Sequence, residues 1–149
     1  MQIHISNDQT VLPIDDACVY KIVEAALAAK EASCKEISFA FVGKEEITEM
    51  HGEYFDDPTP TDCITFPIDP AGPESFLGEV IVCPEVAQEY AKEHGLSVEE
   101  ETILYMIHGI LHLLGYEDID DADREEMRKQ EALVLDAIKN ASALKLSCK

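Results

Sequence analysis

The spacing of apolar residues along this chain changes several times between the period of a strand and that of a helix. Four short runs rich in β-branched or aromatic residues are typical of strands, at residues 2–6, 37–42, 63–68 and 80–82. Longer segments with apolar positions three or four residues apart predict helices, at residues 15–33, 44–55 and 84–94, after residue 97, and after residue 120. This order predicts one compact α+β domain over residues 1–149, with a small mixed four-stranded sheet packed with helices.

The helix expected after Ser97 is apolar on all sides. Ser97 and Glu100 have the spacing of a capping box, and Gly115 is suited to end the helix. Between residues 103 and 114 nearly every residue is apolar apart from Gly109 and two histidines. Such a helix belongs in the interior of a protein.

The two histidines, His108 and His112, lie four residues apart. At this spacing they share one helix face, about 5–6 Å apart at Cβ, and both imidazoles reach one cation at about 2.0–2.1 Å. Buried imidazoles need partners. A shared metal satisfies both, and hydrogen-bonded core histidines are the alternative. A turn at Gly115 would bring back Asp118 as third ligand and leave a fourth position for water. The residues predict a hydrolytic zinc site at the end of a buried helix.

Acidic residues are dense after this helix, at positions 117, 118, 120, 121, 123, 125 and 126. Carboxylates favour a helix N-terminus, and Asp120 can cap the last helix. Asp118 differs because of its register with the histidines. Glu117 has two open interpretations, as an acceptor or base close to the metal and as an exposed side chain.

The charge of the chain limits its partners. There are 31 acidic and 11 basic residues, for a formal net charge of −20, which predicts poor nonspecific affinity for nucleic acid. The two arginines are Arg124 and Arg128, and the lysines form no cluster. An RNA substrate would need a partner to present it, or the metal to bind it. Alternatively, the negative charge reflects only a generic acidic surface.

Other features predict a cytoplasmic protein with no membrane association. No apolar run approaches the length of a membrane span, and residues 1–8 lack the pattern of a secretory signal. The five cysteines are odd in number and scattered without a CxxC pair, which favours reduced thiols.

The sequence lacks the motifs of several classes of hydrolase. Gly109 stands where the His-Glu-x-x-His pattern of metalloproteases has its general base, so peptide hydrolysis is disfavoured. There is no Gly-x-Ser-x-Gly elbow and no phosphate-binding glycine-rich loop. Cys83 as a nucleophile is possible, although a buried cysteine at a strand end is more common. Metal-assisted hydrolysis remains.

Three motifs resemble the YbeY family of metal-dependent endoribonucleases. The segment HGILHLLGY at residues 108–116 is similar to the family's signature. TDCITFP at residues 61–67 resembles the family's Thr-Asp-Val-Leu-Ser-Phe-Pro, and GEVIV at residues 78–82 resembles its Gly-Asp-Ile strand. Met127 and Glu131 stand where the family usually has Met and Glu. The resemblance covers about half of the chain.

The resemblance implies a cytoplasmic, zinc-binding, single-strand-specific endoribonuclease. Its expected roles are maturation of the 3′ end of 16S rRNA and ribosome quality control. Its expected partners are single-stranded rRNA and the small ribosomal subunit or a basic ribosomal protein. The TDCITFP motif at residues 61–67 suggests that Thr61, Asp62 and Thr65 line the substrate cleft.

Two residues depart from the family's pattern. Asp118 replaces a third histidine; zinc accepts a carboxylate at about 2.0–2.2 Å, and the harder ligand favours ions such as Mn²⁺ more than histidine does. Phe55 replaces an arginine that would stabilise charge on the scissile phosphate. We expect Arg124 or Arg128 to supply that charge.

The missing arginine and the acidic charge also suit a different class of function. In this alternative, the chain is a noncatalytic ribosome-assembly factor that keeps the metal and docks on basic ribosomal proteins. A metal-dependent hydrolase of small phosphoesters or peptides is a third alternative.

Overall fold

The elements alternate between strands and helices, as the apolar spacing predicts. We describe a computed structural model, which covers residues 1–55, 62–141 and 144–147. The order is β1 (Gln2–Asp8), α1 (Asp16–Ala29), β2 (Glu36–Val42), α2 (Lys44–Phe55), β3 (Cys63–Pro67), β4 (Phe76–Val82), α3 (Pro84–His94), α4 (Val98–Leu113) and α5 (Asp121–Ala141). The α+β class is confirmed.

Two element boundaries differ from the prediction by more than two residues. Strand β4 begins at Phe76 rather than at residue 80, because Gly78 and Glu79 interrupt the apolar run without interrupting the strand pairing. Helix α1 ends at Ala29 rather than at residue 33, and Glu31, with φ of 51°, turns the chain toward β2.

The sheet is mixed and has the strand order β1-β2-β4-β3. Strands β1, β2 and β4 run parallel, whereas β3 pairs antiparallel with β4, with Cys63 opposite Val82 and Thr65 opposite Val80. Strand β3 is therefore an edge strand that follows α2 in the chain. Its side chains alternate between the two faces of the sheet.

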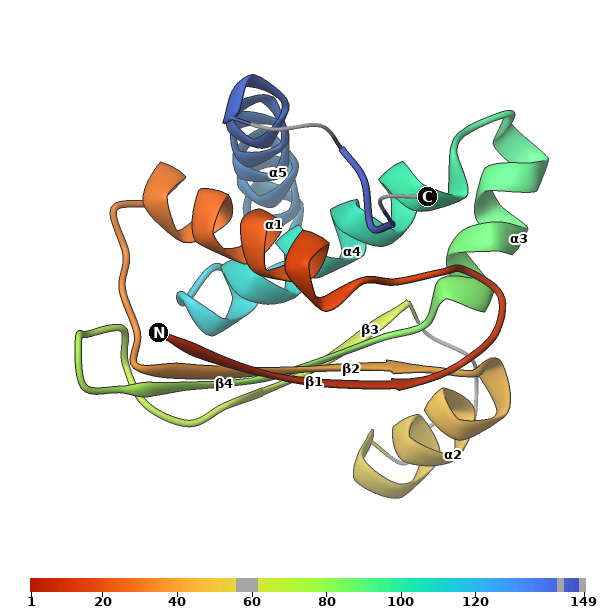
Figure 1. The fold of residues 1–149 in the computed structure, drawn as a ribbon, viewed down its shortest axis with the longest axis horizontal. Helices are drawn as coiled ribbons and strands as arrows, with labels where there is room; N and C mark the ends of the chain where they lie inside the picture. Colours follow the sequence, from red (N-terminus) through yellow and green to blue (C-terminus); the bar gives the residue numbers. More distant parts are fainter. Residues whose placement is uncertain (56–61, 142–143, 148–149) are drawn as a thin grey trace.

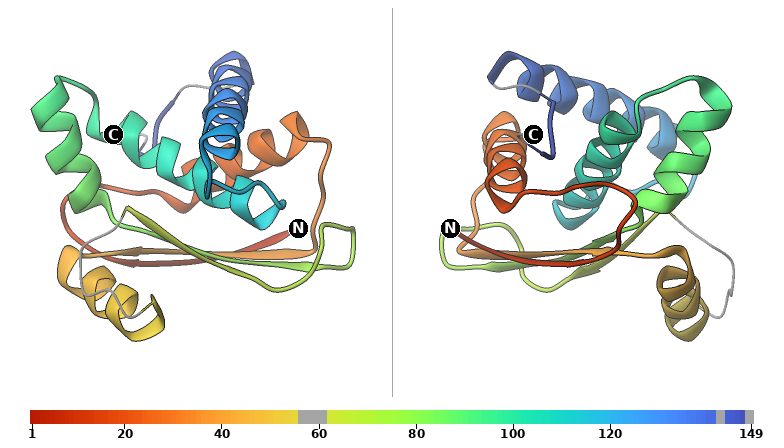
Figure 2. Two further views of the ribbon diagram at one scale, coloured as in Figure 1. Left: turned by 180° about the vertical axis from the view of Figure 1, so that it is seen from behind. Right: turned by 45° about the vertical axis from the view of Figure 1, so that its right-hand side comes forward.

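Helices cover both faces of the sheet. Helices α1, α4 and α5 lie on one face, and α2 lies on the other (Figures 1 and 2). The main core lies on the first face and includes Phe39, Phe41, Met106 and Leu111. A smaller core under α2 is formed by Val42, Ile47, Ile64, Ile81 and Cys83. None of the helices within the described residues is both long and apolar enough to cross a membrane.

Helix α4 approaches β3 and β4 most closely at Gly109. A Cβ atom at this position would lie 2.4 Å from Cγ1 of Val80 and 3.1 Å from Sγ of Cys63. Both distances are shorter than ordinary van der Waals contact. Position 109 thus faces the sheet, so a glutamate there would have no room. This contact explains in steric terms why the metalloprotease base is absent.

We expect Gly109→Ala to destabilise the protein by about 1–3 kcal/mol, because the added methyl group overpacks a core contact with a fully buried valine. Urea unfolding would measure this change. Gly72→Ala is the matched control: no atom lies within 4 Å of its added Cβ, so its unfolding free energy should stay within about 0.5 kcal/mol of wild type. Equal stability of the two variants would contradict the packing analysis.

Candidate metal centre

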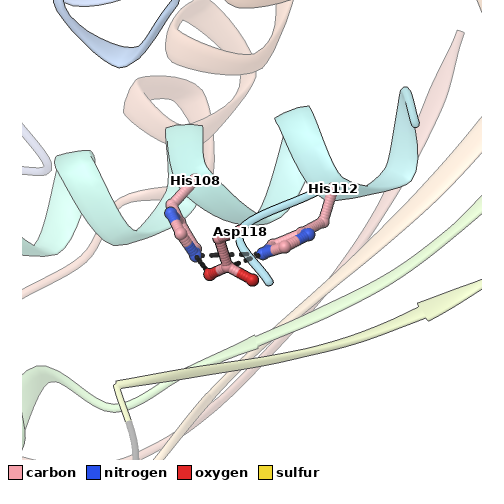
Figure 3. A group of neighbouring side chains, drawn as sticks. All are labelled: His108, His112 and Asp118. Atoms are coloured by element: carbon pink, nitrogen blue, oxygen red, sulfur yellow. Dashed lines mark hydrogen bonds and ion pairs between the residues drawn. The ribbon is translucent and has the colours of Figure 1, made fainter. Parts of the chain in front are cut away.

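Three side chains converge at the C-terminal end of α4 (Figure 3). The Nε2 atoms of His108 and His112 are 3.1 Å apart, and Oδ2 of Asp118 lies 3.4 Å from each of them. Two ligand atoms held about 2.0–2.1 Å from one ion at the tetrahedral angle lie about 3.3–3.4 Å apart. The three atoms therefore have the separation that a single tetrahedral ion requires. The donor set fits zinc and related divalent ions.

The chain reverses direction at the end of α4, and this turn delivers Asp118. The backbone N–H of Tyr116 donates to the carbonyl of Leu111, and Gly115 has a φ of 103°, a left-handed conformation that favours glycine. At the other end of the turn, Asp120 caps α5 by accepting the N–H of Asp123 at 2.8 Å. Asp118 lies in a short connection that is held at both ends.

The two histidines lie on a stripe of α4 that reaches solvent, and Asp118 lies in the turn after the helix. The side chains of His108 and His112 are 23% and 20% exposed, and that of Asp118 is 42% exposed. Most of their neighbours on α4 are buried. The prediction of a buried helix is confirmed, and the histidine stripe is its partly exposed side.

Glu131 of α5 contacts His108 at Nδ1, the ring nitrogen that does not face the other two side chains. Its Oε2 lies 3.4 Å from Nδ1 of His108, and its side chain is 15% exposed. Burial lowers the pKa of His108, but the hydrogen bond and charge of Glu131, with the charges of Asp62 and Asp118, raise it by more, so the pKa of His108 lies above its usual value. When Nδ1–H donates to Glu131, the Nε2 lone pair points at the other ligands.

A pocket of about 300 Å³ opens over the ligands. Its walls come from the ligands themselves, from edge strand β3 and from α2: His51, Phe55, Asp62, Cys63, Ile64, Thr65, His108, His112 and Asp118. Two of the predicted cleft residues, Asp62 and Thr65, thus lie beside the ligands. The third, Thr61, lies outside the described residues.

The remaining predicted site residues, Glu117, Arg124 and Arg128, do not line this pocket. Glu117 is exposed and does not line it. The guanidinium of Arg124 bonds to the carbonyl of Ile119 and to Asp121. Arg128 lines a neighbouring pocket that shares Asp62 and His108 with the metal pocket. Of the two arginines, Arg128 thus shares a pocket with His108, whereas Arg124 lines neither of these two pockets.

Sequence reasoning missed two residues of this site, His51 and Glu131. Glu131 matched a family position but received no role, because it lies 19 residues beyond His112 on a different helix. His51 is more than 50 residues before the ligands and carries no spacing signal. Only the packing of α2 against the edge of the sheet places it in the pocket.

The cysteines near the site are not suited to nucleophilic chemistry. Cys83 is fully buried, and burial raises the pKa of its thiol. Burial also raises the pKa of Cys63 well above its usual range, and the charges of Asp62 and Asp118 add to the effect. Both remain neutral thiols near pH 7, and the common structural interpretation of Cys83 is the better one.

The sequence is similar to one family over almost its whole length. The family described as Endoribonuclease YbeY matches residues 4–139. A protein named Endoribonuclease YbeY from Protochlamydia amoebophila is 42% identical over 131 residues, which is 87% of each chain. A protein of the same name from Chlamydia pneumoniae is 34% identical over 97% of this chain and 95% of its own.

The fold is similar to a solved structure as well. The solution structure of TM1509 from Thermotoga maritima aligns with a TM-score of 0.64 and 26% sequence identity. The alignment covers 93% of this chain and 89% of that one.

We expect Glu131→Gln to weaken binding of a divalent metal by about 10- to 100-fold, because the amide removes the charge that orients and polarises His108. Isothermal titration of the metal-free protein with Zn²⁺ would measure the loss. Glu125→Gln, which neutralises an exposed residue of the same helix, is the control and should bind as wild type does. Equal affinities for both variants would remove the assigned role of Glu131.

We expect Cys63 to react slowly with iodoacetamide at pH 8, although it lines the pocket, because a raised thiol pKa leaves little reactive thiolate. The rate should rise as the pH increases beyond the usual pKa of a cysteine. Peptide mapping by mass spectrometry, with the urea-unfolded protein as reference, would follow this one thiol. Labelling of native and unfolded protein at equal rates would contradict the assigned environment.

Proposed function

Because the chain belongs to the YbeY family of endoribonucleases, we propose that it is a zinc-dependent, single-strand-specific endoribonuclease. Its proposed roles are maturation of the 3′ end of 16S rRNA and ribosome quality control, in the cytoplasm, with the small ribosomal subunit or a basic ribosomal protein as partner. The observation that carries the proposal is the tetrahedral spacing of three ligand atoms at the base of an open pocket.

His108, His112 and Asp118 would hold the ion. A divalent cation there supplies Lewis acidity toward a phosphodiester and lowers the pKa of a water molecule for attack. One ligand is a carboxylate, so Mn²⁺ is a second candidate beside Zn²⁺.

The residues of the walls would bind and orient the RNA. The hydroxyl of Thr65 is a donor for a phosphate oxygen, and the carboxylate of Asp62 is an acceptor for a ribose hydroxyl. Both lie on the pocket wall beside the ligands. A pocket of about 300 Å³ suits one unpaired nucleotide, which agrees with the way most proteins recognise single-stranded RNA.

The noncatalytic assembly factor is the second candidate, because one observation favours it. Within the described part of the chain, neither lysine nor arginine lines the metal pocket. A positive side chain near the scissile phosphate normally stabilises the transition state. The net charge of −20 also suits a basic ribosomal protein as partner.

We expect purified wild-type protein to contain about one equivalent of metal, and His112→Ala and Asp118→Ala to lose both the metal and RNA cleavage, since each removes a ligand. Elemental analysis measures the first property. A labelled single-stranded RNA, compared with the same RNA in a duplex, measures the second. An Asp118→Ala variant that keeps its metal would remove Asp118 from the ligand set.

Cleavage that persists in metal-free His112→Ala would point to a contaminating nuclease. Metal binding in wild type without any cleavage, together with binding to small subunits, would support the assembly factor instead.

We expect Arg128→Ala to lower cleavage more than Arg124→Ala, because Arg128 lines the neighbouring pocket that includes His108, whereas Arg124 is already bonded to Asp121. Steady-state kinetics on the same single-stranded RNA would compare the variants. Unchanged cleavage in the double variant would show that neither arginine replaces the one that the family has at position 55.

A further inference from the structure

Two aromatic side chains at the end of α2 are exposed beside the metal pocket. Tyr54 is 58% exposed and Phe55 is 53% exposed. Phe55 lines the pocket together with the ligands. A large apolar side chain at the mouth of a polar site is a surface on which part of a substrate can pack.

The last turn of α2 fixes the direction of these rings. The ring of Tyr54 packs edge-on against Phe66 of β3, with centroids 5.2 Å apart and planes at 72°. Phe66 also packs on the small core under α2. This contact holds the end of the helix against the edge strand, so Tyr54 faces Phe66 while its neighbour Phe55 faces the pocket.

His51 supports Phe55 on that side. The two residues are four apart on α2 and therefore share one face of the helix. Their ring centroids are 5.5 Å apart, with planes at 46°, and both rings line the pocket. Together they form a short aromatic wall of the pocket.

Because the pocket carries negative charge, we expect the aromatic wall to provide a large part of the affinity for RNA. Asp62 and Asp118 make the walls acidic, and among the described residues no lysine or arginine lines them. Phosphate contacts by basic side chains normally dominate affinity for nucleic acid. A base that stacks on an aromatic ring contributes about 1–3 kcal/mol and needs no charge.

We propose that Phe55, supported by His51, is a stacking platform for the base of the nucleotide next to the scissile phosphate. This assignment rests on the proposed endoribonuclease function. It explains how an acidic chain holds single-stranded RNA: the metal binds the phosphate, and the ring of Phe55 binds the adjacent base. Because every base has a π-face, the platform favours unpaired bases over paired ones without selecting a sequence.

A double-mutant cycle that combines a substitution in the protein with a modification of the RNA tests the platform. Phe55→Leu keeps an apolar side chain and removes the ring, while an abasic nucleotide next to the cleaved bond removes the base. We expect Phe55→Leu to lower kcat/KM on intact RNA by about 5- to 150-fold, the equivalent of one lost stack. On the abasic RNA the same substitution should change kcat/KM by less than about twofold, whereas Phe55→Trp should retain wild-type kinetics on intact RNA.

Two controls accompany the cycle. Leu133→Ala shortens an equally exposed apolar residue on α5, 55% exposed against 53% for Phe55, and should leave the kinetics unchanged. An abasic nucleotide several positions from the cleaved bond should not abolish the effect of Phe55→Leu. An equal loss of kcat/KM for Phe55→Leu on intact and abasic RNA, or no loss on either, would overturn the platform. Cleavage by the wild type would still support the proposed function in that case.

The platform remains testable if the wild type cleaves no RNA. In that case, fluorescence anisotropy measures the affinity of the metal-loaded protein for a short single-stranded RNA and for the same RNA with abasic nucleotides. Weaker binding of the intact RNA by Phe55→Leu, with wild-type binding by Leu133→Ala and no effect of the substitution on the abasic RNA, would support the platform even though the endoribonuclease function has failed. Equal affinity of wild type and Phe55→Leu for the intact RNA, or no binding by the wild type, would overturn it.

Discussion

The close contact between Gly109 and the sheet sets the position of the whole site. Without a side chain at this residue, α4 approaches Val80 and Cys63 closely enough to leave no space for even one Cβ atom. His108 and His112, on either side of Gly109 along the helix, line the open pocket together with residues of the edge strand β3. If α4 lay farther from the sheet, both imidazoles would move relative to Asp62 and Thr65, which belong to the β3 side.

Around this contact, different elements supply different parts of the site. Helix α4 and the turn after it provide the three side chains that could hold a metal, Glu131 of α5 contacts one of them, and β3 and α2 form walls of the pocket. The helices that provide ligands and orientation lie on one face of the sheet, and α2 lies on the opposite face. Only an edge strand lets side chains from both faces meet, which gives a physical reason for the site's location at β3.

Asp118 and Phe55 shift the charge of the pocket in the same direction. Asp118 adds negative charge to the ligand set, and Phe55 leaves the pocket wall without the positive charge of an arginine. The pocket without metal is therefore acidic in an acidic protein, which favours a divalent cation and disfavours a phosphate. A bound cation is the largest charge in such a site and reverses that preference. Binding of an anionic substrate then depends on the metal more strongly than in a site that carries its own arginine.

The sequence alone determined the elements whose signals are local. Periodicity predicted the strands and helices, with errors only at boundaries such as the start of β4. The four-residue spacing of the histidines and the turn at Gly115 predicted the converging ligand set, because helix geometry fixes both. Glu131, His51 and the stacking face of Phe55 were not assigned in this way. They lie on other helices, and their distance from the ligands depends on how α5 and α2 pack against the core and the edge strand. That packing is a property of the whole apolar interior, so only the tertiary structure decided it.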